Sequence, residues 1–291
     1  MQFERLTAAH RELIAPYFQG LLSRTCDLTV STVLMWREVN RTEFCIKDGN
    51  LFLRLIGFSG RECYFLPLGG DLRAGVETLR ASVSDPLRFV SVPKEYLPAL
   101  EACKGSLSVE ENRDYFDYLY RAEDLKTLSG KKYAKKRNLI SQFDRAYPES
   151  EVRNMDGATR EEALDFFHRL IESLGEGESK VERLEREGCE CVLSDPTLCG
   201  MQGLALYVQG KMVGFSLGEP LGDTLFTHIE KADRAYKGVY QKLTNTFANT
   251  FATGEVAFIN REDDAGDEGL RRAKLDYYPC ALLEKYTVTL S

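Results

Sequence analysis

Residues 203–221 read GLALYVQGKMVGFSLGEPL, and they repeat a pattern that the chain has already used at residues 44–57, FCIKDGNLFLRLIG. Each stretch holds two apolar runs with strand-forming residues. A short turn containing glycine separates the runs, Asp48-Gly49 in the first stretch and Gln209-Gly210 in the second. This pattern predicts one β-hairpin in each half of the chain.

A similar order of elements follows each hairpin. In the first half we expect a strand (CYFLPL), a glycine pair, a helix capped by Asp71, and then further strands and helices up to DYFDYLYRAEDL. In the second half we expect a strand (TLFTHIE), the loop RAYKG, a helix from Val239, a strand (EVAFIN), a short helix (EGLRRAK) and a closing strand (ALLEKYTVTL). The sequence therefore predicts an α+β chain with two similar domains, residues 1–147 and 148–291. Each would be a mixed, mostly antiparallel sheet flanked by helices. One larger sheet is the alternative.

Composition narrows the class of protein. The chain has 291 residues with a formal net charge of −7, which argues against broad, non-specific binding of nucleic acid. Its eight cysteines are scattered, and CECVLSDPTLC lacks the ligand spacing of a zinc site, so we predict no metal and expect free thiols. No apolar run is long enough to span a bilayer, and the first residues are charged where a signal peptide is apolar. We expect a cytoplasmic protein.

A basic stretch interrupts this acidic background at residues 128–143, LSGKKYAKKRNLISQF. It predicts a helix over 129–146, whose apolar stripe includes Tyr133 and Phe143. Lys136 and Arg137 flank that stripe, where a charge is costly unless it is paired or used. Two interpretations follow: the side chains pair with acids of the second domain, or they line a cleft between the domains and bind an anionic ligand.

A second charged stretch covers residues 259–279, INREDDAGDEGLRRAKLDYYP. Polar groups that leave the carboxyl end of a strand are well placed to line a ligand crevice. Acids at the start of a helix are also ordinary capping residues. The cluster alone supports either interpretation.

Together, the two stretches and HIEKA resemble signatures of the C-terminal domain family of bacterial phosphatidylglycerol lysyltransferases, and more narrowly its soluble stand-alone members. The most specific motifs are K-x-x-K-K-R-N, from Lys132 to Asn138, and N-R-E-D-D, from Asn260 to Asp264. The resemblance covers nearly the whole chain and implies two tandem GNAT-like (acyl-CoA N-acyltransferase-like) domains. Membrane-associated members of the family move an aminoacyl group from aminoacyl-tRNA to a lipid head group.

The identity of the acyl donor is a separate question. CoA-dependent GNAT enzymes hold pyrophosphate in a glycine-rich loop that opens a helix. The corresponding loop here, RAYKGVY, has a single glycine and places Tyr240 where a small residue is expected. Aminoacyl-tRNA instead needs cations for phosphate and acids for the α-ammonium group, and the two charged stretches supply both. We therefore favour aminoacyl-tRNA modestly over acyl-CoA and predict no required cofactor.

The chemistry would be direct attack of an amine or hydroxyl on an acyl carbon, and a carboxylate can accept the proton. Alternation along TLFTHIE predicts that Phe226, His228 and Glu230 share one face of a strand. We expect Glu230 to act as the base or as an ammonium anchor, supported by His228. A surface role for Glu230, paired with Lys231 or Arg234, is the alternative.

The leading hypothesis is an acyl- or aminoacyltransferase with a small-molecule or peptide acceptor. In this hypothesis tRNA is a candidate partner that would contact the basic helix. The alternatives are a CoA-dependent N-acyltransferase of a small amine or peptide, and a non-catalytic module that binds an anionic ligand. The catalytic candidates are Glu230 and His228. The candidates for donor or substrate binding are Lys132, Lys135, Lys136, Arg137, Asn138, Arg234, Tyr236, Gly238, Asn260, Arg261, Glu262, Asp263, Asp264 and Lys274.

Overall fold

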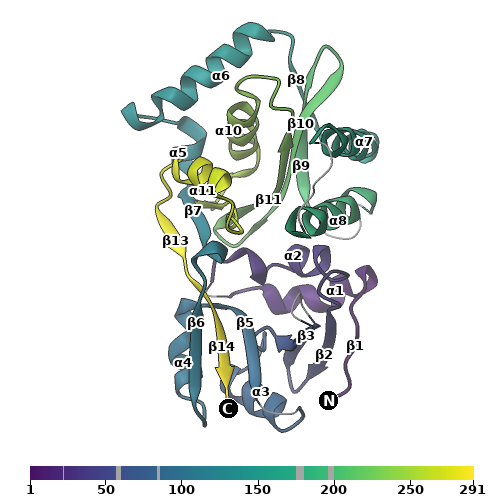
Figure 1. The fold of residues 1–291 in the computed structure, drawn as a ribbon, viewed down its shortest axis with the longest axis vertical. Helices are drawn as coiled ribbons and strands as arrows, with labels where there is room; N and C mark the ends of the chain where they lie inside the picture. Colours follow the sequence, from purple (N-terminus) through teal and green to yellow (C-terminus); the bar gives the residue numbers. More distant parts are fainter. Residues whose placement is uncertain (22, 57–59, 84–85, 175–179, 196–199) are drawn as a thin grey trace. The chain divides into compact units, whose positions relative to one another are not determined.

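The computed structural model of the chain describes residues 1–21, 23–56, 60–83, 86–174, 180–195 and 200–291. The described residues form two seven-stranded mixed sheets, each flanked by helices (Figure 1). The prediction of an α+β chain with two domains is therefore confirmed.

The first sheet has the strand order β1-β2-β3-β4-β5-β14-β6. Its strands are β1 (Glu4–Arg5), β2 (Glu43–Lys47), β3 (Asn50–Ile56), β4 (Glu62–Tyr64), β5 (Leu87–Pro93), β14 (Lys285–Leu290) and β6 (Leu107–Glu111). The α-helices of this unit are α1 (Arg11–Ile14), α2 (Val30–Met35), α3 (Leu72–Arg80) and α4 (Leu97–Glu101).

The second sheet has the order β13-β7-β12-β11-β10-β9-β8. Its strands are β13 (Ala281–Leu283), β7 (Asp117–Arg121), β12 (Phe258–Asn260), β11 (Thr224–Ala232), β10 (Lys211–Leu221), β9 (Gln202–Val208) and β8 (Glu151–Asn154). Its helices are α5 (Ala122–Thr127), α6 (Ala134–Ala146), α7 (Gly157–Leu174), α8 (Lys180–Ser194), α10 (Val239–Phe251) and α11 (Glu268–Leu275).

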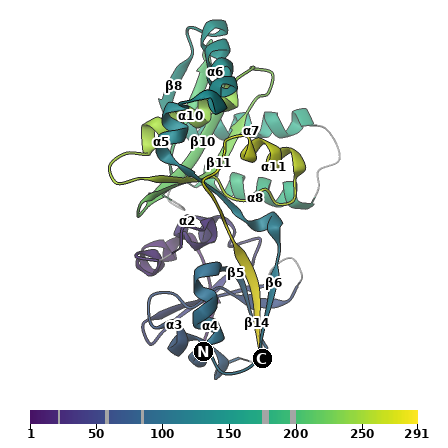
Figure 2. The same ribbon diagram turned by 90° about the vertical axis from the view of Figure 1, so that its left-hand side faces the viewer.

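The compact units do not follow the expected boundary between residues 147 and 148. Unit 1 comprises 1–117, 263–268 and 282–291, and unit 2 comprises 118–262 and 269–281. The reason is an exchange of strands. β7, from the first half of the chain, pairs with β12. The last strand, β14, lies between β5 and β6 (Figures 1 and 2). The basic helix α6 consequently belongs to unit 2, where it contacts α10.

Both predicted hairpins are present. The β2–β3 turn has positive φ at Asp48 (49°) and Gly49 (77°), and the β9–β10 turn has positive φ at Gln209 (50°) and Gly210 (73°). Two consecutive residues with positive φ match the turn that the twist of an antiparallel hairpin favours. The predicted helix cap is also confirmed, because Asp71 accepts a hydrogen bond from the backbone N–H of Ala74 at 2.8 Å.

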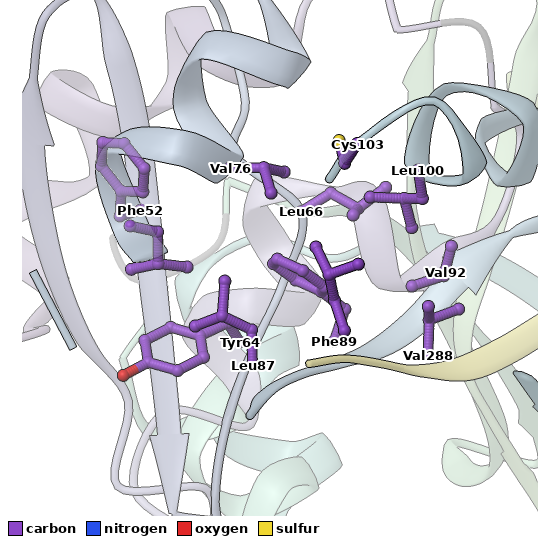
Figure 3. Close-up of a cluster of buried hydrophobic side chains, with 12 residues drawn as sticks. Phe52, Tyr64, Leu66, Val76, Leu87, Phe89, Val92, Leu100, Cys103 and Val288 are labelled. Atoms are coloured by element: carbon purple, nitrogen blue, oxygen red, sulfur yellow. The ribbon is translucent and has the colours of Figure 1, made fainter. Parts of the chain in front are cut away.

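The core of unit 1 is built between its sheet and helices α3 and α4. Phe89 and Val92 of β5 pack with Val76 of α3, Leu100 of α4 and Val288 of β14 (Figure 3). The last strand therefore contributes to the core of the unit that contains the start of the chain.

In unit 2 the helices cover both faces of the sheet. α7 and α8 lie on one face of β9–β11, and α10 lies on the other face together with α6 (Figure 1). Among the residues that the structure describes, no helix combines the length and apolar character that crossing a bilayer requires.

Candidate active site

Unit 2 contains a nearly buried ion pair between Glu230, on β11, and Arg261, directly after β12. Arg261 Nη2 lies 2.8 Å from Glu230 Oε1, and the two side chains are only 13% and 10% exposed. The hydroxyl of Thr244 on α10 donates to the same carboxylate, 3.0 Å from each oxygen. Burial by itself lowers the pKa of Arg261, but the charge of Glu230 outweighs this effect and raises it. The guanidinium is therefore charged and fixed in place.

His228 does not join this pair. Its Nδ1 lies 2.8 Å from Glu262 and its Nε2 lies 3.2 Å from Glu219, and the imidazole is fully buried. Burial alone would lower the pKa of His228, but the hydrogen bonds and charges of the two glutamates outweigh it and raise the pKa to about 9. At neutral pH the ring is an imidazolium and has no lone pair with which to accept a proton.

The prediction that His228 and Glu230 share a face of β11 is wrong, because a β-bulge interrupts the alternation. Phe226 pairs with Glu219 and Glu230 pairs with Ser216, while His228 is the extra residue between. Residues 216 and 219 of the partner strand point to opposite faces, so Phe226 and Glu230 do as well. The ring of His228 stacks on Phe226, 6.0 Å between centroids.

The acids at 263 and 264 also have internal partners, both in unit 1. Asp263 lies 3.4 Å from the ammonium of Lys285, and Asp264, which is fully buried, lies 3.5 Å from Arg113. Asn260 is buried and accepts the N–H of Glu262 at 2.6 Å. The N-R-E-D-D motif thus forms internal contacts along its whole length. This differs from the expectation that its acids bind the α-ammonium group of an aminoacyl donor.

The ring of Tyr277 gathers several of the predicted residues. The Lys136 ammonium lies 4.2 Å from the ring centroid and the Arg261 guanidinium 4.9 Å from it. Lys136 is 7% exposed, and its nearest acid in an ion pair is Asp276, 3.8 Å away. Burial lowers the pKa of Lys136, against the opposing charge of Asp276.

The hydroxyl of Tyr277 is buried, and it has no hydrogen-bond partner among the described residues. The neighbouring hydroxyl of Thr244 donates its proton to Glu230. Burial raises the pKa of Tyr277 to about 12, although Arg261 and the nearby Thr244 hydroxyl oppose the shift, so the phenol keeps its proton at neutral pH. We call Lys136, Glu230, Thr244, Arg261 and Tyr277 the tyrosine cluster.

Lys274 supports the cluster from α11. Its ammonium is buried and donates to the backbone carbonyl of Arg261 at 2.6 Å. The hydroxyl of Tyr120 on β7 donates in turn to the carbonyl of Lys274 at 2.8 Å. Lys274 therefore fixes the backbone that carries Arg261.

The remaining cations of the basic helix are arranged differently. Lys132 and Lys135 are exposed, as is Asn138, and Lys132 lies 3.4 Å from Asp124. Arg137 donates to the carbonyls of Leu128 and Gly130, which follow α5. Lys136 lies near the ring of Tyr277, as Arg261 does, and it pairs with Asp276, an acid of the second half of the chain, as the pairing interpretation expects. Arg137 instead stabilises the turn before its own helix.

The loop that would hold pyrophosphate is closed by the basic helix. A Cβ on Gly238 (φ +89°) would lie 2.3 Å from the backbone oxygen of Leu139 in α6. Tyr236 packs against Tyr147 at the end of α6, with ring centroids 5.2 Å apart and the rings tilted by 53°, while Arg234 is exposed. The start of α10 is thus packed against α6 at Gly238, which leaves no open space on that side of the loop for a phosphate.

The chain is similar to a known protein family. The family model for the C-terminal domain of phosphatidylglycerol lysyltransferase matches residues 18–289. The chain belongs to this family. Its fold is that of two tandem GNAT-like domains.

Three relatives illustrate the range of similarity. A conserved protein of unknown function from Bacteroides thetaiotaomicron is 32% identical, with both chains fully covered and a TM-score of 0.91. L-PGS from Bacillus licheniformis shares the fold at 15% identity, with 86% of this chain and 83% of that chain covered and a TM-score of 0.59. The protein MYCGA3080 of Mycoplasmoides gallisepticum is 26% identical over 192 residues, 65% of this chain and 61% of its own length.

A groove of about 560 Å³ is lined by residues of α7, by the β9–β10 turn and by Asp233 and Tyr236 beside the same loop. Its apolar lining includes Phe166 and Met212. Carboxylates and cations both line it: Glu162, Asp165 and Asp233 against Arg169 and Lys211. Three acids in the hollow beside the loop disfavour a polyphosphate there.

The thiol and carboxylates of Cys26, Asp27 and Asp117 lie close enough together to hold one cation. In this structure the ammonium of Lys285 takes that place, 2.6 Å from Asp27 and 2.8 Å from Asp117. Cys26 and the six other described cysteines form no disulfide, and Cys199, in the stretch without zinc spacing, lies outside the described residues. The two carboxylates of this group are therefore ion-paired with Lys285.

Sequence reasoning missed Tyr277, Thr244 and Glu219. Tyr277 lies inside the quoted 259–279 stretch, but nothing in its spacing separates it from Tyr278. Glu219 offered a usable signal, because a carboxylate just before the end of the apolar run of β10 requires a partner.

Proposed function

We propose that this protein is an aminoacyltransferase that moves an aminoacyl group from aminoacyl-tRNA to an amine or hydroxyl acceptor. Family membership supports transfer of an acyl group as the reaction class. The observation that carries the proposal is the tyrosine cluster, in which two cations flank a buried tyrosine whose hydroxyl is unpaired.

The cluster suits attack on an ester. The acceptor nitrogen or oxygen would bond to the acyl carbon, and the carbonyl oxygen would gain negative charge before the ester C–O bond breaks and the tRNA hydroxyl leaves. The Tyr277 hydroxyl, with the charges of Lys136 and Arg261, can stabilise that oxygen. The acceptor's proton would pass to Glu230 through water, or to the leaving oxygen. An acceptor amine with pKa ~10.4 must first lose a proton, at a cost of about 4.6 kcal/mol at pH 7.

The basic helix supports the choice of donor. Lys131, Lys132 and Lys135 are exposed near the start of α6, on the helix whose Lys136 is in the cluster. Contacts of this kind with phosphates bind without reading sequence and weaken as salt rises. The covered start of α10 and the carboxylates of the neighbouring groove weigh against acyl-CoA.

The experiment compares wild type with Tyr277→Phe in a transfer assay that contains tRNA charged with a labelled amino acid mixture and candidate amines. Because the hydroxyl has no partner, its removal should leave the unfolding temperature unchanged, whereas transfer should fall about 100-fold. Tyr207→Phe is the matched control. It removes a hydroxyl that donates to Glu162 at 2.6 Å, so it should cost about 1 kcal/mol of stability and leave transfer intact.

Two results would contradict the proposal. One is full activity in Tyr277→Phe, which would remove the cluster from the chemistry. The other is acyl transfer by wild type from acetyl-CoA and none from aminoacyl-tRNA, which would establish the CoA-dependent alternative. Binding of tRNA without turnover of any acceptor would instead support a binding module.

A further inference from the structure

Unit 1 contains a buried lysine surrounded by acids. The ammonium of Lys285, at the start of β14, lies 2.6 Å from Asp27, 2.8 Å from Asp117 and 3.4 Å from Asp263, and its side chain is 2% exposed. Asp117 also accepts the backbone N–H of Cys26 at 2.7 Å. One ammonium thus binds three carboxylates that come from separate segments of the chain.

Two of these carboxylates occupy special places in the chain. The chain leaves unit 1 after Asp117 and returns to it at Asp263. Just beyond these points, in unit 2, the two segments pair with each other: Tyr118 donates its N–H to the carbonyl of Glu262 at 3.1 Å, and Arg261 donates to the carbonyl of Tyr118 at 3.1 Å. Lys285 therefore binds Asp117 and Asp263, which directly adjoin the paired residues Tyr118 and Glu262.

The ladder contains a strained residue. Glu262 has φ +58°, a conformation that costs a non-glycine residue energy and persists only where its surroundings impose it. Within unit 2 its backbone is held by Asn260 and Tyr118, and its side chain by His228. The next residue, Asp263, is held by Lys285. The strained residue thus has an anchor on each side.

We propose that Lys285 is a positioning residue for the candidate active site: by binding Asp117 and Asp263 it fixes the strained turn at Glu262, and so places the side chains of Arg261 and Glu262. This role rests on the proposed function, because Arg261 is the cation that the transfer reaction would use. Lys285 itself is assigned no contact with substrate. It acts through the two segments that it clamps.

Three variants test the role. Asp263→Asn removes one carboxylate charge from the clamp and leaves the ion pairs of Lys285 with Asp27 and Asp117. Lys285→Met removes the whole clamp at similar side-chain length. Lys94→Met is the control, because Lys94 forms a surface ion pair with Glu284 at 2.8 Å in the same unit and is 61% exposed.

Two measurements need neither donor nor acceptor. The first is the pKa of His228 by NMR, which is tractable because the chain has only three histidines. The second is hydrogen exchange of the Tyr118 and Arg261 amides, compared with amides in the β10–β11 ladder. We expect Asp263→Asn and Lys285→Met to lower the His228 pKa by one unit or more and to speed exchange at the two amides at least tenfold. Lys94→Met should change neither.

An unchanged His228 pKa and unchanged local exchange in Asp263→Asn would overturn the proposal, even if its unfolding temperature falls, because the cluster would then only stabilise unit 1. Should Lys285→Met fail to fold, Asp263→Asn still decides the question. The proposed function fails differently, through absence of transfer by wild type. Where transfer is measurable, the clamp variants should lower kcat and leave the affinity for tRNA intact.

Discussion

Replacing Gly238 with alanine tests whether the basic helix closes the start of α10. Gly238 has φ +89°, so any side chain there is strained by about 1–2 kcal/mol. The added Cβ would also lie 2.3 Å from the backbone oxygen of Leu139, and a backbone contact of this kind is relieved only if α6 moves. Overpacking typically costs about 1–3 kcal/mol, so the two effects together predict a loss of about 2–5 kcal/mol.

Gly210→Ala separates the two effects. Gly210 has φ +73° and nothing within 4 Å of an added Cβ, so this variant measures the backbone strain alone. Thermal unfolding followed by circular dichroism, together with hydrogen exchange in α6 and α10, would give both losses. Gly238→Ala should unfold several degrees lower than Gly210→Ala, with faster exchange concentrated in these two helices. Equal losses in the two variants would show that α6 does not cover the loop, and the structural argument against CoA would fail.

Three further predictions concern charged residues. The His228 pKa rises from 6.5 to about 9 on folding, so the protonated side chain should stabilise the folded state by about 3 kcal/mol. This stabilisation should be complete below pH 6.5 and disappear as pH rises through about 9. In urea titrations, His228→Gln should remove this pH dependence of the free energy of unfolding. Glu230→Gln leaves the buried Arg261 unpaired, so it should lower the free energy of unfolding by about 3–5 kcal/mol and abolish transfer. Glu185→Gln breaks a half-exposed ion pair with Lys231 and should lower the free energy of unfolding by less than about 1 kcal/mol. Lys135→Ala should weaken tRNA binding and reduce its salt dependence by about one charge, with stability unchanged within about 0.5 kcal/mol.

The sequence was sufficient for the local elements. Turn chemistry located both hairpins, and helical spacing located α10 and the basic helix, because these signals lie within a few residues of each other. The order of the strands was not accessible in this way. β7 and β14 read as ordinary strands, and nothing in either run indicates that its partners are more than 100 residues away. That is why the boundary expected at residue 147 differs from the compact units.

The same limit applies to the candidate site. Period-two alternation placed His228 beside Glu230, and a single bulged residue reversed the result. Bulges depend on pairing with the neighbouring strand, which the run TLFTHIE does not reveal. The basic helix was predicted better, because the position of Lys136 beside an apolar stripe is a property of the helix itself, and Lys136 is indeed buried.

The two charged stretches, residues 128–143 and 259–279, differ in how their charges are paired in the structure. Exposed lysines of the basic helix remain available to a polyanion. The acids of N-R-E-D-D are each matched by a cation of the chain itself, and two of those cations, His228 and Lys285, are buried. A substrate ammonium could use these acids only by displacing a buried cation, which costs several kcal/mol per uncompensated charge. The acids of this motif are therefore engaged within the chain, and the proposed transfer reaction leaves substrate charge to the cations.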